Sequence, residues 1–81
     1  AGGMPDENAR RLVEVLKGKI SPARDIIVIN SGAAVYVSGL ASTLKKGASM
    51  AEEAIDSGEA LETLKSMVRA NGEPEKLERF L

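Results

Sequence analysis

Near the beginning of the chain, apolar and polar residues alternate with the period of an α-helix. Within residues 5–17, the apolar positions follow the i, i+3, i+4, i+7 spacing of one helical face: Ala9, Leu12, Val13 and Leu16. Pro5 suits the first turn of a helix, and Gly18 is a residue that commonly ends one. The pattern predicts an amphipathic helix over residues 5–17.

Two later segments show the same helical period. Residues 43–57 carry a narrow apolar stripe, and residues 59–71 carry a second apolar face that Asn71-Gly72 would end. The apolar positions of these two segments are Leu44, Ala48, Ala51 and Ile55, followed by Leu61, Leu64, Met67 and Val68. Both segments are predicted to be helices that bury one face.

Gly47 lies inside the first of these stripes and has two interpretations. A glycine in a helix interior costs about 1 kcal/mol relative to alanine, so its presence needs a reason. Either another backbone approaches closely at Gly47, or the glycine only frays the first turn of the helix. The pattern leaves both interpretations open.

The end of the chain is predicted to form a short helix over residues 74–81. Pro74 lies near its first turn, and Leu77, Phe80 and Leu81 line one side of it. A disordered C-terminus is the alternative, because the last residues of a domain are often poorly ordered.

Residues 21–38 combine the signals of a helix with those of a strand. Ser21 as an N-cap, followed at once by proline, favours a helix, whereas the β-branched run at residues 26–29 favours a strand. A hairpin with its turn at residues 30–32 therefore competes with a single helix. The apolar content continues beyond this point and is long for one strand, which favours a helix over residues 22–38.

As a single helix, residues 22–38 would be apolar on nearly every side, as only deeply buried helices are. Gly32, Ala33 and Ala34 would let neighbouring helices approach closely. The other predicted helices can cover this one only in part, and an exposed apolar remainder usually marks an interface. We therefore expect residues 1–81 to be a single helical unit that either forms a homo-oligomer or is a fragment of a larger domain.

Composition and charge exclude several classes of protein. The chain has 11 basic and 12 acidic residues, so its net charge of −1 gives no attraction to nucleic acid or to an anionic membrane. The absence of Cys and His excludes disulfides, Cys/His zinc sites and His-based triads. We also expect no signal peptide, and the chain has no apolar run of membrane-spanning length. We expect a cytoplasmic protein that binds neither nucleic acid nor membrane.

Three stretches stand out in order along the chain: "GGMPDENARRLVEVLKG", "PARDIIVINSGAAVYVSGLA" and "LKKGASMAEEAIDSGEALETLKSMV". Their residues, order and spacing resemble the C-terminal end of anthranilate phosphoribosyltransferase over about residues 2–68. Residues 69–81 carry no such resemblance. At residues 30–32 this chain has Asn-Ser-Gly where the family more often has Asn-Ala-Ala, a departure that would loosen the helix locally.

The resemblance implies that residues 22–38 form a helix, because the matching region of the family is helical. It implies an all-α chain, a small bundle of about four or five helices around the central hydrophobic helix 22–38. These helices would correspond to the C-terminal helices of a larger α/β domain, whose other parts pack around the central helix.

The resemblance also implies the chemistry of the parent family. That family transfers a phosphoribosyl group from phosphoribosyl pyrophosphate, with magnesium, to the amine of anthranilate in tryptophan biosynthesis. Its Gly-Thr-Gly-Gly-Asp phosphate loop, its Lys-His-Gly-Asn-Arg segment and its paired Asp-Glu metal site all lie upstream of the matched region. We therefore expect no catalytic, cofactor-binding or metal-binding residue in this chain, and no cofactor bound to it.

The remaining candidate groups have simpler structural interpretations. Gly2-Gly3 ahead of a helix could cradle a phosphate, but Asp6 and Glu7 at that helix start would repel the anion, which favours an ordinary loop.

Other polar groups are similarly weak candidates. Glu52, Glu53 and Asp56 lie at helical spacing and could touch a divalent cation, but carboxylates on one helical face are usually just solvated. Asn30 in a buried helix would need a hydrogen-bond partner, and Tyr36 is expected in the core with its hydroxyl at an edge.

Two classes of function stay open at this point. The chain is either a structural segment of the transferase, which works with the missing part of the parent enzyme, or a stand-alone helical module for self-association. The sequence does not decide whether the chain counts as part of an enzyme.

Overall fold

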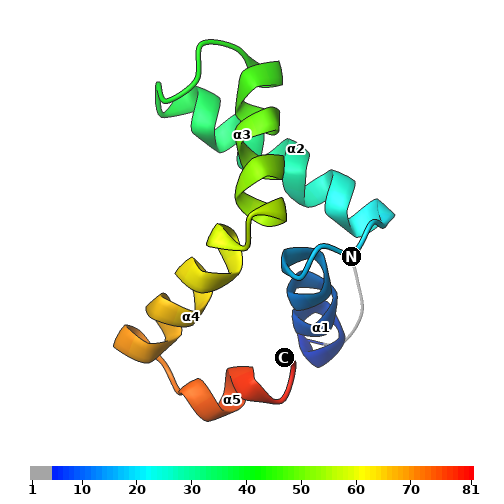
Figure 1. Cartoon of the computed structure of the whole chain (residues 1–81), viewed down its shortest axis with the longest axis vertical. Coiled ribbons are helices and arrows are strands. Elements are labelled where there is room, and N and C mark those ends of the chain that lie inside the picture. Colours follow the sequence, from blue (N-terminus) through cyan, green and yellow to red (C-terminus); the bar gives the residue numbers. More distant parts are fainter. Residues whose placement is uncertain (1–4) are drawn as a thin grey trace.

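The computed structural model describes residues 5–81, which form five helices and no strand (Figure 1). The helices are α1 Pro5–Leu16, α2 Pro22–Val37, α3 Leu44–Asp56, α4 Glu59–Asn71 and α5 Pro74–Glu78. In Figure 1, α2 and α3 cross each other, α4 runs on from the end of α3, and α5 turns back so that the C-terminus lies beside α1. The expectation of a small all-α bundle is confirmed.

Residues 22–37 form one continuous helix, so the hairpin interpretation is wrong. The Ser21 hydroxyl oxygen accepts a hydrogen bond from the backbone N–H of Arg24 at 3.2 Å, which caps the start of α2 as its Ser-Pro signal predicts. At the other end Gly39 has a φ of +85°, and its N–H donates to the carbonyl oxygen of Tyr36 at 3.0 Å. This hydrogen bond is typical of a helix that ends at a glycine. A residue with a β-carbon would strain the backbone at Gly39 because φ is positive there.

The departure from the family pattern at residues 30–32 does not interrupt α2, and it marks the point where α2 and α3 meet. Gly32 of α2 and Gly47 of α3 are both buried. A β-carbon built on Gly32 would lie 2.6 Å from the backbone nitrogen of Ala48, and one built on Gly47 would overlap the carbonyl oxygen of Gly32. The two helices therefore touch backbone to backbone, and the interpretation of Gly47 as a point of close approach is confirmed.

The hydrophobic core lies where the first four helices meet. Its buried members come from three of them: Val15 and Leu16 of α1, Val28 of α2, and Ile55 of α3. Half-buried side chains pack around this cluster, including Leu61 and Leu64 of α4. The close crossing of α2 and α3 thus positions Val28 and Ile55 in one core, and burial of this kind overrides the strand propensity of a β-branched run.

Several predicted side-chain positions are wrong. Tyr36, expected in the core, is 43% exposed, and Asn30, expected in a buried setting, lies on the exposed side of α2. Leu44 and Met67, assigned to apolar faces, are exposed as well. The physical reason is that these side chains lie on the correct helices but on faces that no neighbouring helix covers in the described part of the chain.

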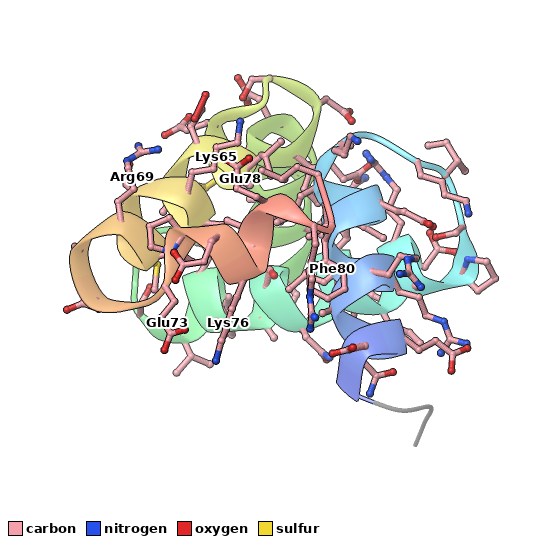
Figure 2. All side chains as sticks on the ribbon, turned by 90° about the horizontal axis from the view of Figure 1, so that it is seen from below. Lys65, Arg69, Glu73, Lys76, Glu78 and Phe80 are labelled. Carbon is pink, nitrogen blue, oxygen red and sulfur yellow. The ribbon has the colours of Figure 1, made fainter. Side chains whose placement is uncertain are left out.

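The C-terminal segment contains the predicted short helix, and its last residues make polar contacts with α1 and with Lys17 just beyond it. The Nζ of Lys17 donates to the carbonyl oxygen of Leu81 at 2.6 Å, and an Nη of Arg79 donates to an Oδ of Asp6 at 3.0 Å. Figure 2 shows Phe80 between α5 and α1. The guanidinium carbon of Arg79 lies 4.9 Å from the centre of the Phe80 ring. The segment therefore turns back toward α1, and its regular helix ends at Glu78 rather than at residue 81.

We expect the Phe80→Ala variant to release this tail. Phe80 is half-buried, so its truncation should lower the free energy of unfolding by about 1 kcal/mol, less than the 3–5 kcal/mol typical of a fully buried Phe. Amide hydrogen exchange should speed up in residues 74–81 while α2 and α3 stay protected. Met67→Ala, which truncates an exposed side chain on α4, is the control and should change neither quantity.

Unaltered amide protection of residues 74–81 in Phe80→Ala would show that the ion pair and backbone contact hold the tail without the aromatic ring.

Candidate functional site

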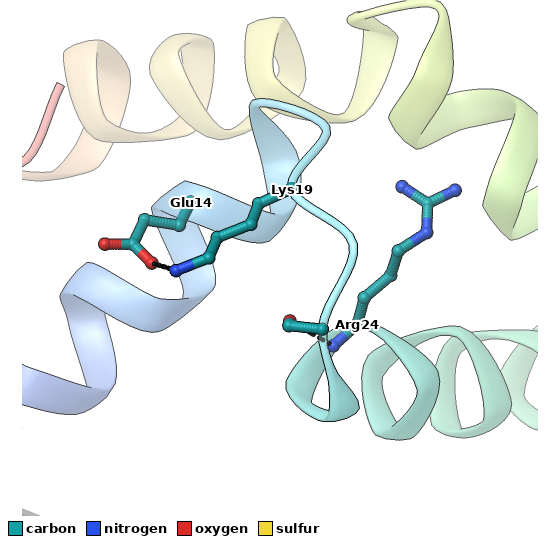
Figure 3. A network of polar contacts seen from close by, with 4 residues as sticks. Glu14, Lys19 and Arg24 are labelled. Carbon is teal, nitrogen blue, oxygen red and sulfur yellow. Dashed lines mark hydrogen bonds and ion pairs between the residues drawn. The ribbon is translucent and has the colours of Figure 1, made fainter.

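The described residues contain one buried charged side chain, Arg24 at the start of α2, which is 5% exposed. One of its terminal nitrogens, Nη2, donates to Oδ1 of Asp56 at 2.9 Å, and the other, Nη1, is buried without a hydrogen-bond partner. In Figure 3 the guanidinium extends away from α2, toward the side where α3 ends. The pair ties the first turn of α2 to the last residue of α3, so it acts as a structural clamp.

Nothing in the sequence singled out Arg24. A basic residue beside an aspartate near a helix start is typical of a solvated first turn, and its ion-pair partner lies 32 positions away in the chain. Only the crossing of α2 and α3 brings the two side chains together.

Glu14 and Lys19 form a second polar contact, on the surface beside the end of α1 (Figure 3). The Nζ of Lys19 donates to Oε2 of Glu14 at 2.9 Å, and this hydrogen bond, with the charge of Lys19, holds the pKa of Glu14 below its ordinary value of 4.5. Because the folded-state pKa is lowered, the contribution to stability is present above the ordinary value and is lost as the pH falls through the lowered one. Both side chains are well exposed, as in a surface salt bridge.

An open groove of about 520 Å³ lies between α2, α3 and the start of α4. Apolar side chains make up most of its wall: Leu16, Ile27, Val35, Met50, Ala51, Ala54, Ile55 and Ala60. Its few polar members include Ser57, whose hydroxyl already bonds the carbonyl oxygen of Ala54 and the N–H of Glu59, both at 3.3 Å. A ligand pocket combines apolar walls with a few precisely placed polar groups, and the Ser57 hydroxyl of this groove is already engaged by backbone partners.

The three acidic residues considered as metal ligands do not come together in a metal site within residues 5–81. Glu52, Glu53 and Asp56 are exposed on α3, and Asp56 is already paired with Arg24. Within residues 5–81, no group of three or more metal-ligating side chains lies close enough together to hold a metal ion. The Gly2-Gly3 candidate lies outside the described residues. In the same described range, no helix has both the length and the apolar content needed to cross a membrane.

The geometry of the described residues is that of packed helices. Comparison with known proteins identifies proteins of similar sequence. Residues 1–61 match the family model described as "Glycosyl transferase family, a/b domain". The chain is 51% identical over 67 residues to anthranilate phosphoribosyltransferase of Methanococcoides burtonii, which covers 83% of this chain and 19% of that protein. The corresponding enzyme of Hyphomonas neptunium is 44% identical over 72 residues, covering 89% of this chain and 21% of the relative. No solved structure matches the chain.

The resemblance drawn from the three sequence stretches is thus confirmed. The chain spans about a fifth of the length of these relatives, 19% in one and 21% in the other, so it matches a segment of the enzyme. Since the family model matches most of its residues, the chain belongs to the glycosyl transferase family whose a/b domain it matches over residues 1–61.

Proposed function

We propose that this chain is the C-terminal structural segment of a phosphoribosyltransferase that joins anthranilate to phosphoribosyl pyrophosphate in tryptophan biosynthesis. It contributes helical scaffold to that enzyme and no reacting group. The observation that carries the proposal is the match to anthranilate phosphoribosyltransferases over 83–89% of this chain, at 44–51% identity.

The side chains of the described residues support a scaffold role. The buried charge of Arg24 is paired with Asp56, and the groove between α2, α3 and α4 is walled mostly by apolar side chains. The core is built from helix-to-helix contacts. Magnesium, which the parent family uses, does not fit here: the acidic side chains of α3 are exposed and point to no shared centre in residues 5–81. The catalytic and metal-binding groups would then belong to the missing part of the enzyme.

A segment exchange tests this proposal. In the Methanococcoides burtonii enzyme, the 67 matching residues are replaced by the corresponding residues of this chain, and formation of phosphoribosyl anthranilate is measured. We expect the chimera to keep activity within about tenfold of the parent, a change of about 1.4 kcal/mol in barrier, because a scaffold replaced by a similar scaffold leaves the reacting groups in place. The 81-residue chain alone should show no activity.

The matched control is the same chimera carrying Gly47→Val, which should fail to fold into an active enzyme because the α2–α3 crossing has no room for a side chain. A soluble, folded chimera without activity would contradict the proposal, and so would turnover by the 81-residue chain alone.

A second candidate, a stand-alone helical self-association module, has one specific observation in its favour. α2 exposes several large apolar side chains, among them Ile26, Ile29 and Val37. Exposed apolar groups in a contiguous arrangement are typical of protein interfaces.

A further inference from the structure

The turn between α4 and α5 places an asparagine directly before a glycine. Asn71 is the last residue of α4, and Gly72 is the residue at which the helix ends. Both residues are exposed. Gly72 has a φ of −129° and a ψ of −154°, an extended conformation that residues with a β-carbon also adopt. The backbone conformation therefore does not require a glycine here, in contrast to Gly39 with its φ of +85°.

Two hydrogen bonds of the last helical turn hold this pair in place. The backbone N–H of Gly72 donates to the carbonyl oxygen of Val68 at 2.8 Å, and Nδ2 of Asn71 donates to the carbonyl oxygen of Met67 at 3.5 Å. The second hydrogen bond is long and therefore weak. Helix ends fray, so opening the chain at this turn requires less free energy than opening the interior of a helix. Once the turn opens, the Gly72 nitrogen can meet the side chain of Asn71.

We propose that Asn71 is a site of self-modification, at which the asparagine is converted to aspartate or isoaspartate. The backbone nitrogen of Gly72 attacks Cγ of Asn71, the bond from Cγ to Nδ2 breaks, and the nitrogen's proton leaves with the departing ammonia. The product is a cyclic succinimide. Water then opens this ring at either of its carbonyl carbons, so the net reaction consumes water and releases ammonia.

The missing side chain at residue 72 makes this attack accessible. A β-carbon there would crowd the nitrogen as it approaches Cγ, and glycine gives the backbone more freedom to rotate into that approach. The other two asparagines, Asn8 and Asn30, are followed by alanine and serine. They are exposed, as Asn71 is, but each lies before the last turn of its helix. The residue that follows and the position on the helix therefore distinguish Asn71, whereas exposure does not.

Either product changes the connection between α4 and the C-terminal tail. Both place a negative charge beside Glu73 at the C-terminal end of α4, where the helix dipole disfavours it. In isoaspartate the chain continues through the former side-chain carbonyl, which adds a methylene to the backbone. This displaces the tail from α1, including Arg79 from its partner Asp6. Hydrogen exchange should therefore be faster in residues 74–81 of the converted chain than in the unconverted chain.

Incubation of the purified 81-residue chain at neutral and mildly alkaline pH, followed by peptide mapping by mass spectrometry, tests this inference. We expect Asn71 to convert at least about tenfold faster than Asn8 or Asn30, which corresponds to a barrier lower by about 1.4 kcal/mol. The products should include isoaspartate, which is detected by its enzymatic methylation. The rate should rise with pH, because the attacking nitrogen must lose its proton.

The Gly72→Ala variant tests the role of the missing side chain. Its β-carbon would lie 3.3 Å from the carbonyl oxygen of Val68 and 3.5 Å from Cγ1 of the same residue. The contact is tight, but the backbone is extended, so the chain should remain helical by circular dichroism. Conversion of Asn71 should slow by about tenfold or more.

The Ser31→Gly variant separates the effect of the following glycine from that of the helix end. It places a glycine after Asn30 at an exposed position in the interior of α2. In the folded chain Asn30 should still convert at least about tenfold more slowly than Asn71, because α2 must open in its interior before the ring can form. In concentrated urea, where no helix holds either pair, the two rates should become similar.

Three results would overturn the inference: conversion of Asn71 no faster than that of Asn8 or Asn30, an unchanged rate in Gly72→Ala, or equal rates at Asn30 and Asn71 in the folded Ser31→Gly chain. This inference goes beyond the proposed scaffold role and does not depend on it. An inactive chimera would remove the scaffold proposal without affecting the rate at Asn71, and a stable Asn71 would leave the scaffold proposal intact.

Discussion

Gly47→Ala should lower the free energy of unfolding by about 3 kcal/mol, even though alanine is the better helix former. In an isolated helix the same change would stabilise by about 1 kcal/mol. Here the added β-carbon overlaps the carbonyl oxygen of Gly32, and a backbone atom has no rotamer in which to move aside. The two helices must separate, which loosens Val28 and Ile55 in the core.

Thermal unfolding followed by circular dichroism measures this effect, and a loss of this size corresponds to roughly 15 °C in Tm for a domain of this length. Ser49→Ala is the matched control, since Ser49 is exposed on the same helix and its replacement should change the stability by less than about 0.5 kcal/mol. A Gly47→Ala protein that is more stable than the parent would mean that α2 and α3 do not touch at this point.

Asp56→Ala should produce the second-largest effect, a loss of about 2 kcal/mol. The carboxylate is 61% exposed and so gains little from the pair itself, but its removal leaves the guanidinium of the 6% exposed Arg24 side chain without the one partner it has. Leaving a buried donor unsatisfied costs about 1–3 kcal/mol. A small gain opposes this, because a negative charge at the C-terminal end of α3 is disfavoured by the helix dipole.

The Arg24→Met variant distinguishes two contributions to the free energy of unfolding. One is the cost of leaving a buried charge without a partner, and the other is the loss of the ion pair itself. The variant keeps an unbranched side chain in place and removes the buried charge, so it should destabilise the chain less than Asp56→Ala does. Glu52→Ala removes an exposed carboxylate from the same helix and should have an effect within about 0.5 kcal/mol of zero. Equal stability of Asp56→Ala and the parent in urea titration would show that the guanidinium has no need of this carboxylate.

Local signals predicted the helices themselves. The Ser21-Pro22 pair starts α2 where the sequence indicates, and Gly18 and Gly58 follow the ends of α1 and α3. The hairpin alternative at residues 30–32 could not be excluded from periodicity, because β-branched residues fit either structure. The family resemblance decided that point.

Which helical faces are covered could not be predicted, because this depends on contacts distant in the chain. Periodicity assigns Leu44 and Met67 to apolar faces but does not show whether a neighbour lies against them. For the same reason Tyr36 was wrongly placed in the core and Arg24 was overlooked.

The chemistry was easier to limit than the packing. Since the chain lacks His and Cys, thiol and imidazole chemistry was excluded by composition alone. The position of carboxylates was less certain from sequence. Glu52, Glu53 and Asp56 share a helix, and only the structure shows that Asp56 belongs to an ion pair with Arg24.

The proposed helical scaffold is organised by the backbone contact of α2 with α3. Nuclear Overhauser spectroscopy on the isotopically labelled chain tests that contact most directly. Because the backbones touch at Gly32, Gly47 and Ala48, we expect cross-peaks from the α-protons of Gly32 to the amide proton of Ala48. We also expect sequential helical cross-peaks through residues 30–32. Absence of the Gly32–Ala48 peak, together with cross-strand peaks flanking residues 30–32, would contradict that contact.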